Sequence, residues 1–102
     1  MNINEDHLIQ CISFGQETLE ECDFTRCRKL VKIPMTIPET LKRIDFMFKQ
    51  CVDFNDSNVW SWDISHVFSM KGLFIDTKIQ IESCIWSLSD DYKRSLFTMG
   101  LY

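Results

Sequence analysis

The sequence predicts an α/β fold in which about four repeated units, each a short strand followed by a short helix, stack into a solenoid. Two observations lead to this prediction. Three Gly and two Pro make up about 5% of the 102 residues, whereas these two residue types together account for roughly 12% of average proteins. Short sequence patterns also return at intervals of 22 to 28 residues, and a fixed period of this length is typical of proteins built from stacked units.

The repeats are visible in two pairs of segments. Residues 17–24 read Glu-Thr-Leu-Glu-Glu-Cys-Asp-Phe and residues 39–46 read Glu-Thr-Leu-Lys-Arg-Ile-Asp-Phe, which gives five identities in eight positions. Residues 62–65, Trp-Asp-Ile-Ser, return as Trp-Ser-Leu-Ser at residues 86–89. We expect one domain over residues 1–102, and its units are approximately 8–30, 31–54, 55–79 and 80–102.

Each unit is expected to begin with a strand and to continue into one or two helical turns. Apolar residues at steps of three and then one share a face of a short helix. A period of 20 to 29 residues with a strand and a short helix is the length class of leucine-rich repeats. The expected strands are Leu8 to Phe14, Leu30 to Ile33, Val59 to Ile64 and Ile79 to Leu88, and the helical faces are Leu41, Ile44, Met47, Phe48 and Val67, Met70, Leu73, Phe74.

Residues 24–74 carry a family resemblance. The series Phe24-x-x-Cys27-x-x-Leu30-x-x-Ile33, followed by Ile37-Pro38-x-x-Leu41-x-x-Ile44-x-x-Met47-Phe48, resembles the BspA-like leucine-rich-repeat family. The continuation Trp60-x-Trp62-Asp63-Ile64-Ser65-x-Val67-x-x-Met70-x-x-Leu73-Phe74 is similar to the W-D-V-S-x-V-x-x-M-x-x-M-F branch of that family. The resemblance implies a right-handed, leucine-rich-repeat-like solenoid of short parallel strands that is used for protein recognition, often on cell surfaces.

The repeated polar steps explain how a chain so poor in Gly and Pro changes direction. In the W-D-x-S step, the short side chains of Asp63 and Ser65 are expected to bond to nearby backbone groups and turn the chain.

The net charge of −4 disfavours non-specific binding to nucleic acid or to an anionic membrane. Residues 26–49 nevertheless carry a net charge of +5, between acidic ends. These bases either form a solvated outer face balanced by the acidic N-terminal unit, or form a patch for an acidic protein partner or a phosphate backbone. The candidate binding residues are Arg26, Arg28, Lys29, Lys32, Lys42 and Arg43.

Trp60 is a further candidate contact residue, because only Trp62 of the Trp60-Ser61-Trp62 pair has a counterpart, Trp86. If Trp60 is exposed, it is a typical hot-spot residue. The alternative is that it fills a gap between units.

We expect neither catalysis nor a cofactor or metal. Asp63, Ser65 and His66 form a weak Ser/His/Asp candidate, no phosphate-binding glycine loop occurs, and the five cysteines contain no C-x-x-C pair. An odd number of cysteines without a secretory signal favours reduced, structural thiols and a cytoplasmic location. Cys27 and Cys51 occupy equivalent positions and are expected to be buried, and no apolar run is long enough for a transmembrane helix.

Stacked units leave a hydrophobic edge at each terminus unless an atypical unit covers it. The sequence ends on an apolar cluster, so we expect a second copy or a partner to cover it and the chain to form a homodimer. The predicted oligomer edge consists of Leu96, Phe97, Met99, Leu101 and Tyr102.

These features predict a small non-catalytic protein-interaction module, an adaptor or stoichiometric inhibitor of phage or mobile-element origin. Two alternatives are a nucleic-acid-facing protein that uses residues 26–49, and a fragment-like member of a surface repeat array. Binding to random DNA that falls steeply with salt would favour the nucleic-acid alternative.

Overall fold

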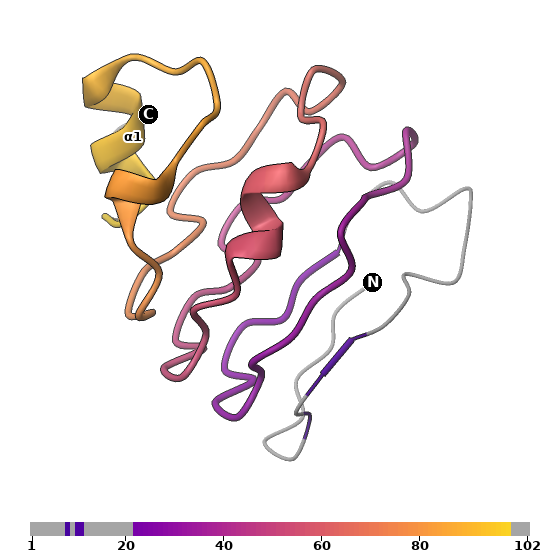
Figure 1. Ribbon diagram of the computed structural model, residues 1–102, viewed down its shortest axis with the longest axis vertical. Coiled ribbons are helices and arrows are strands. Elements are labelled where there is room, and N and C mark those ends of the chain that lie inside the picture. Colours follow the sequence, from indigo (N-terminus) through magenta and orange to yellow (C-terminus); the bar gives the residue numbers. More distant parts are fainter. Residues whose placement is uncertain (1–7, 9, 12–21, 99–102) are drawn as a thin grey trace.

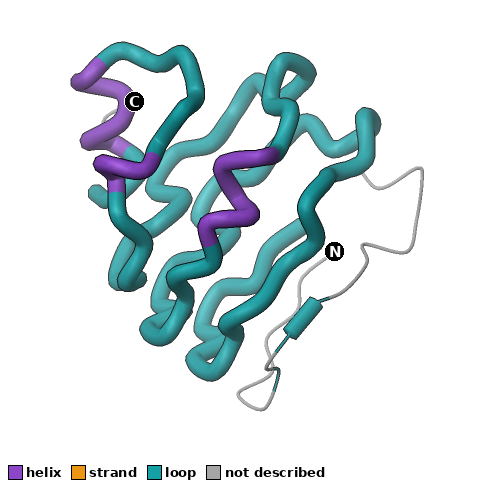
Figure 2. The backbone as a smooth tube through the Cα atoms, in the orientation of Figure 1, coloured by secondary structure: helices purple, strands orange, loops and turns teal. Residues whose placement is uncertain are grey.

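Figure 1 shows the computed structural model of the chain, which describes residues 8, 10, 11 and 22–98. The helical elements are two short 3-10 helices, η1 (Ser57–Ser61) and η2 (Ile81–Ser83), and one α-helix, α1 (Asp90–Ser95). The rest of the described chain consists of turns and extended backbone, as the tube in Figure 2 shows.

The predicted α/β solenoid of parallel strands and short helices is wrong, and so is the leucine-rich-repeat architecture that it implied. The described residues contain no β-strand, and their β-pairing consists of isolated bridges, which include the parallel bridges of Gln10 with Lys32 and of Arg43 with Ser69. Two of the predicted strands instead overlap with 3-10 helices. Part of η1 lies in the predicted strand Val59 to Ile64, and all of η2 lies in the predicted strand Ile79 to Leu88. Residues 12–14 of the first predicted strand lie outside the described residues.

Consecutive turns take the place of the predicted helices and strands. The N–H of Cys27 donates to the carbonyl oxygen of Phe24 at 2.9 Å, and the N–H of Leu30 donates to that of Cys27 at 3.0 Å. In the same way, the N–H of Leu41 donates to the carbonyl oxygen of Pro38, and the N–H of Met47 donates to that of Ile44. Each bond closes a four-residue turn. The apolar residues at these steps are buried: Phe24, Cys27, Leu30, Ile33, Leu41, Ile44 and Met47.

The three-residue spacing of the apolar side chains explains this outcome. An α-helix has 3.6 residues per turn and hydrogen bonds from residue i to i−4, whereas a strand buries every second residue. A chain that turns at every third residue keeps each apolar side chain on the inside with hydrogen bonds from i to i−3. The predicted helical faces are therefore buried, with only Val67 half-exposed, although no helix forms around them.

Backbone hydrogen bonds also join segments that are distant in the sequence. The N–H groups of Phe24, Phe48 and Phe74 donate to the carbonyl oxygens of Met47, Leu73 and Leu96, at 2.7, 3.1 and 2.6 Å. The three Phe residues thus occupy corresponding positions in successive stretches of chain, which we call passes. In Figures 1 and 2 these passes lie side by side.

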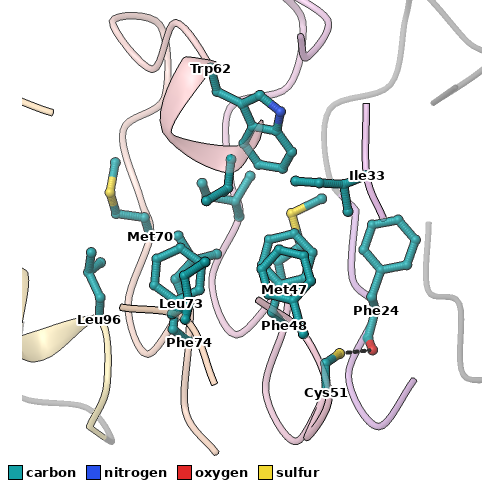
Figure 3. Close-up of a cluster of buried hydrophobic side chains, with 14 of the residues drawn as sticks. Phe24, Ile33, Met47, Phe48, Cys51, Trp62, Met70, Leu73, Phe74 and Leu96 are labelled. Carbon is teal, nitrogen blue, oxygen red and sulfur yellow. Dashed lines mark hydrogen bonds between the residues drawn. The ribbon is translucent and has the colours of Figure 1, made fainter. Parts of the chain in front are cut away.

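A column of aromatic rings runs through the core and crosses the passes. The rings of Phe24 and Phe48 are stacked with centroids 5.8 Å apart, and those of Phe48 and Phe74 are 5.9 Å apart. Phe97 continues the column with a tilted ring 5.6 Å from Phe74. Figure 3 shows Phe24, Phe48 and Phe74 in a row. Because aromatic side chains remove large apolar areas from water, this column contributes to the packing between passes.

The corners of the passes use left-handed backbone, mostly without glycine. Arg26, Gln50 and Asp76 have φ values of 67°, 62° and 58°. Phe46 and Gly72, with φ of 56° and 55°, form a second set of left-handed residues. Residues other than Gly adopt this region at a cost of roughly 1–2 kcal/mol, so the shortage of Gly carries an energetic penalty at these corners.

Aspartate side chains close further turns. Asp23, Asp56 and Asp63 each accept, at Oδ1, the N–H of the residue two positions later, at 2.7, 3.0 and 3.0 Å. This confirms the expected backbone bond of the W-D-x-S step for the Asp63 side chain, whereas the Ser65 hydroxyl bonds to the Asp63 carboxyl instead.

Helix α1 lies at the C-terminal end of the described chain. The hydroxyl oxygen of Ser89 caps it by accepting the N–H of Tyr92 at 3.1 Å. Asp90 and Asp91 lie in its first turn and Lys93 and Arg94 in its last, which is the favourable arrangement for the helix dipole.

The expectation that Leu96 forms part of an open oligomer edge is wrong. Leu96 is fully buried and its carbonyl oxygen accepts the N–H of Phe74. The N–H groups of Leu96, Phe97 and Thr98 donate within the α1 turn, to the carbonyl oxygens of the residues three positions earlier. These donors therefore do not point toward a further pass. Phe97 is half-buried against Phe74, and Met99, Leu101 and Tyr102 lie outside the described residues.

Candidate functional site

A cleft of about 510 Å³ opens between residues 62–70 and residues 86–92. We call it the Phe68 cleft. Its wall is mostly apolar and combines the two Trp-x-x-Ser steps with a side chain from α1. The lining residues are Trp62, Asp63, Ile64, Ser65, Val67, Phe68, Met70, Trp86, Ser87, Leu88 and Tyr92.

Among the large apolar side chains that line the cleft, Phe68 is the most exposed, with 65% of its surface accessible. Its backbone N–H donates to the carbonyl oxygen of Lys42 at 3.0 Å, and the neighbouring Ser69 pairs with Arg43 in a parallel bridge. This pairing places the Arg43 guanidinium over the Phe68 ring, 5.2 Å from its centroid. A cation over an aromatic face is attracted to the ring electrons, so the contact orients the exposed ring.

The back of the cleft is rigid because its tryptophans belong to the core. Trp62 and Trp86 are 2% and 6% exposed. The indole N–H of Trp62 donates to the carbonyl oxygen of Pro34 at 2.8 Å, and the Trp86 ring packs edge-on against Trp60 at 4.8 Å. The cleft therefore exists before any ligand arrives.

Asp63 contributes a negative charge to the cleft. The backbone N–H of Ser65, followed by the Ser65 hydroxyl, lowers the pKa of the Asp63 carboxyl below its ordinary value, with a smaller contribution from nearby His66. Asp63 is therefore ionised at neutral pH.

The Ser/His/Asp candidate lies in the turn that follows Trp62. Asp63 and Ser65 are bonded to each other in their turn. The Nε2 atom of His66 is buried and has no hydrogen-bond partner, so it does not hold the Ser65 hydroxyl as a general base would.

Tyr92 reaches the cleft from α1. Burial raises the pKa of its hydroxyl, an effect opposed by the backbone N–H of Met70 and reinforced by nearby Asp45. The phenol therefore stays neutral and lies close to the pass that carries Phe68.

The structure divides the predicted basic residues between two regions, although all six are exposed. Lys42 and Arg43 contact Phe68. Arg26 instead donates to the side-chain oxygen of Gln50 at 3.0 Å. Arg28 lines a second cleft of about 560 Å³ with Gln50, Val52 and Asp76, and Lys29 and Lys32 follow it along the chain.

Trp60 is buried, with 4% of its surface exposed. Its ring packs edge-on against Phe74 at 5.4 Å and against Trp86. The alternative in which Trp60 fills a gap in the core therefore holds, and the exposed aromatic residue of this region is Phe68. Sequence reasoning missed Phe68 and Tyr92; the available signal was that Phe68 stands between two residues of the apolar series, Val67 and Met70.

None of the five cysteines, all of which lie among the described residues, forms a disulfide bond. Cys27 and Cys51 are buried as expected, and the Cys51 thiol donates to the carbonyl oxygen of Phe24 at 3.0 Å (Figure 3). Burial raises the pKa of both Cys22 and Cys51 to about 12. Among the described residues, no group of three His, Cys, Asp or Glu side chains is placed to hold a metal ion.

Residues 22–98, together with 8, 10 and 11, include no helix with the length and apolar character needed to cross a membrane. No protein-family model, curated protein or solved structure matches the chain. The resemblance of residues 24–74 to the BspA-like family thus stays a prediction from sequence motifs, and the fold that it implies differs from the observed one.

Proposed function

We propose that this chain is a small, non-catalytic protein-interaction module that binds a partner protein through the Phe68 cleft. The observation that carries the proposal is the exposed Phe68 ring, held under Arg43 at the edge of an apolar cleft. Aromatic side chains beside well-packed pockets contribute much of the binding energy in protein interfaces.

The cleft has properties that favour binding by shape. Its tryptophans are fixed in the core, so binding costs little ordering of the protein. Its volume lies within the range of about 300–1,000 Å³ of known ligand clefts. Because the exposed Phe68 leaves the cleft open to solvent, it suits a chain segment that lies across it better than an enclosed small molecule.

The polar groups of the cleft support a binding role over a catalytic one. Asp63 and Ser65 are engaged in their turn, where they position the backbone between Trp62 and Val67. A protein that binds a partner through this cleft without catalysis would act as an adaptor or a stoichiometric inhibitor. The odd number of cysteines, five, favours reduced thiols and a reducing compartment such as the cytoplasm.

Selection of random peptides displayed on phage against the immobilised full chain tests the proposal. We expect the wild type to enrich peptides and Phe68→Ala to weaken their binding by about tenfold or more, as for a hot-spot residue. Met35→Ala is the matched control, because Met35 is 59% exposed and does not line the cleft. Equal binding by wild type and Phe68→Ala would overturn the assignment of the cleft.

A further inference from the structure

Asp63 sets the charge of the Phe68 cleft. Of the described residues that line the cleft, it alone is charged, and the others are apolar, aromatic or hydroxyl side chains. The Asp63 side chain is exposed, and its Oδ1 atom accepts the N–H of Ser65 at 3.0 Å. The turn therefore holds a carboxylate on a mostly apolar wall, and a positive ligand group complements such a wall.

The carboxylate keeps acceptor capacity for a ligand. An ionised carboxylate has two oxygens with about four lone-pair sites, whereas the bonds that it accepts within the turn come from the N–H and the hydroxyl of Ser65. Asp63 can therefore accept further hydrogen bonds from a cationic group while its own orientation stays fixed by the turn.

The aromatic part of the wall also favours a cation. The aromatic lining residues are Trp62, Phe68, Trp86 and Tyr92. Aromatic rings attract cations, and Phe68 shows this attraction within the chain, because the Arg43 guanidinium lies 5.2 Å from its ring centroid. Lysine and arginine join a positive charge to an apolar stem, so they fit a mostly apolar wall that carries one carboxylate.

The basic residues of the chain do not reverse this preference. The described lining of the cleft includes none of the six basic residues predicted to bind a partner. Arg43 contacts the Phe68 ring without belonging to this lining, and the ammonium group of Lys42 donates to the carbonyl oxygen of Glu39 at 3.0 Å. The net charge of −4 acts in the same sense as Asp63 over longer distances, because an acidic chain attracts basic partners.

We propose that the side chain that enters the Phe68 cleft is a lysine or arginine of the partner protein, whose stem packs on the apolar wall and whose charge pairs with Asp63. This inference rests on the proposed function and adds the chemical class of the contact residue. An acidic side chain or a phosphate backbone fits less well, because the Asp63 carboxylate repels it.

The test uses one peptide selected on the wild-type full chain. Each lysine of the peptide is replaced in turn by norleucine and each arginine by citrulline, which keep an uncharged stem and remove the charge. We expect one such replacement to weaken binding to the wild type by about three- to tenfold, through loss of the ion pair and of the attraction to the rings. On Asp63→Asn the same replacement should weaken binding less, by a factor of about two to five, which is the coupling typical of an exposed pair.

The protein variants are chosen to preserve the backbone. Asp63→Asn keeps an oxygen that can accept the Ser65 N–H, so the turn is retained. Asp76→Asn is the matched control, because it removes the same charge from an exposed residue of the second cleft. Asn also tolerates the left-handed φ of 58° at position 76. On Asp76→Asn we expect the neutral replacement to weaken binding as much as on the wild type.

The outcomes separate this inference from the proposed function. Neutral replacements that leave the affinity unchanged at every basic position, with binding still lost in Phe68→Ala, would overturn the basic contact residue while the binding role stands. Selected peptides without lysine or arginine would overturn it in the same way. Equal effects of Asp63→Asn and Asp76→Asn would indicate a net-charge effect and would also overturn it. Enrichment of no peptide by the wild type would overturn both proposals.

Discussion

The rings of Phe48 and Phe74 lie parallel, with 4° between their planes and 5.9 Å between their centroids, although they belong to successive passes. Phe54 packs on the same Phe48 ring at 4.2 Å. The described chain has no strands, but backbone hydrogen bonds recur at every second residue between these passes. Together with the side-chain packing, they fix the register, and their donors are the N–H groups of Ile44, Phe46, Phe48 and Gln50, which bond to the carbonyl oxygens of Ser69, Lys71, Leu73 and Ile75.

Replacement of Phe48 by Ala tests the importance of this column. Phe48 is fully buried, and such a truncation typically costs about 3–5 kcal/mol. We expect Phe48→Ala to lower the free energy of unfolding in urea by that amount. Phe68→Ala, at an exposed ring, should change it by less than about 0.5 kcal/mol; a similar loss for both variants would contradict this account of the core.

The neighbouring tryptophans provide a second comparison. The indole N–H of Trp60 is buried without a hydrogen-bond partner, whereas that of Trp62 donates to Pro34. Each Trp→Phe replacement loses part of a buried ring, but Trp62→Phe also leaves a carbonyl oxygen unpaired, an added cost of about 1–3 kcal/mol. Thermal unfolding should therefore show Trp62→Phe as the less stable variant, and the reverse order would contradict the hydrogen-bond assignment.

The left-handed corners predict that one glycine substitution is stabilising. Gln50 has φ of 62°, a region that Gly adopts without steric cost. We expect Gln50→Gly to raise the free energy of unfolding by up to about 1 kcal/mol. Gln80→Gly is the control, because Gln80 has φ of −97° and the added chain entropy should destabilise the protein slightly. Equal effects of the two changes on the urea midpoint would count against left-handed backbone at Gln50.

Gly72 provides the converse test. A Cβ atom at Gly72 would lie 2.6 Å from the Phe46 ring and 2.8 Å from Cδ1 of Ile75, and its φ is +55°. Gly72→Ala should therefore destabilise the protein through both overpacking and backbone strain, by about 1–3 kcal/mol or more. Unchanged stability in urea would show that the corner is looser than described.

The buried thiols predict how stability depends on pH. Burial, with a smaller contribution from a neighbouring cysteine, raises the pKa of Cys22 and Cys51 from 9.0 to about 12. The folded state therefore holds these protons more tightly than the unfolded state. Their contribution to stability is complete below pH 9 and is lost as the pH rises from about 9 toward 12. Urea titrations on either side of pH 9 should show a steeper decline for the wild type than for Cys22→Ala/Cys51→Ala; parallel declines would rule out these thiols as the cause.

The sequence predicted which residues are buried better than it predicted the fold class. The apolar steps at Leu41, Ile44, Met47 and Phe48 are buried, as expected for one face of a helix. A spacing of three, however, also fits a series of turns closed by i to i−3 hydrogen bonds. Apolar spacing does not distinguish these two backbones, because it specifies side-chain direction and not the hydrogen-bond partner.

The left-handed corners and the cleft could not be predicted from the types of the residues that form them. Arg26 and Gln50 adopt left-handed φ values, and neither residue type signals such a corner as Gly or Asn would. Trp60 and Phe68 are both aromatic residues next to repeat positions, but only the arrangement of the passes buries Trp60 against Phe74 and leaves Phe68 exposed. The turn at Asp63 could be predicted because the hydrogen bond that closes it joins the Asp63 side chain to the N–H of Ser65, two residues later in the sequence.

Amide chemical shifts of the isotopically labelled full chain, recorded during titration with a selected peptide, test the central claim most directly. We predict that the largest shift changes fall on residues 62–70 and 86–92, which line the Phe68 cleft, and that Phe68→Ala removes them. Changes centred on Arg28 and Val52, the lining of the second cleft, would contradict the claim that the Phe68 cleft is the binding site.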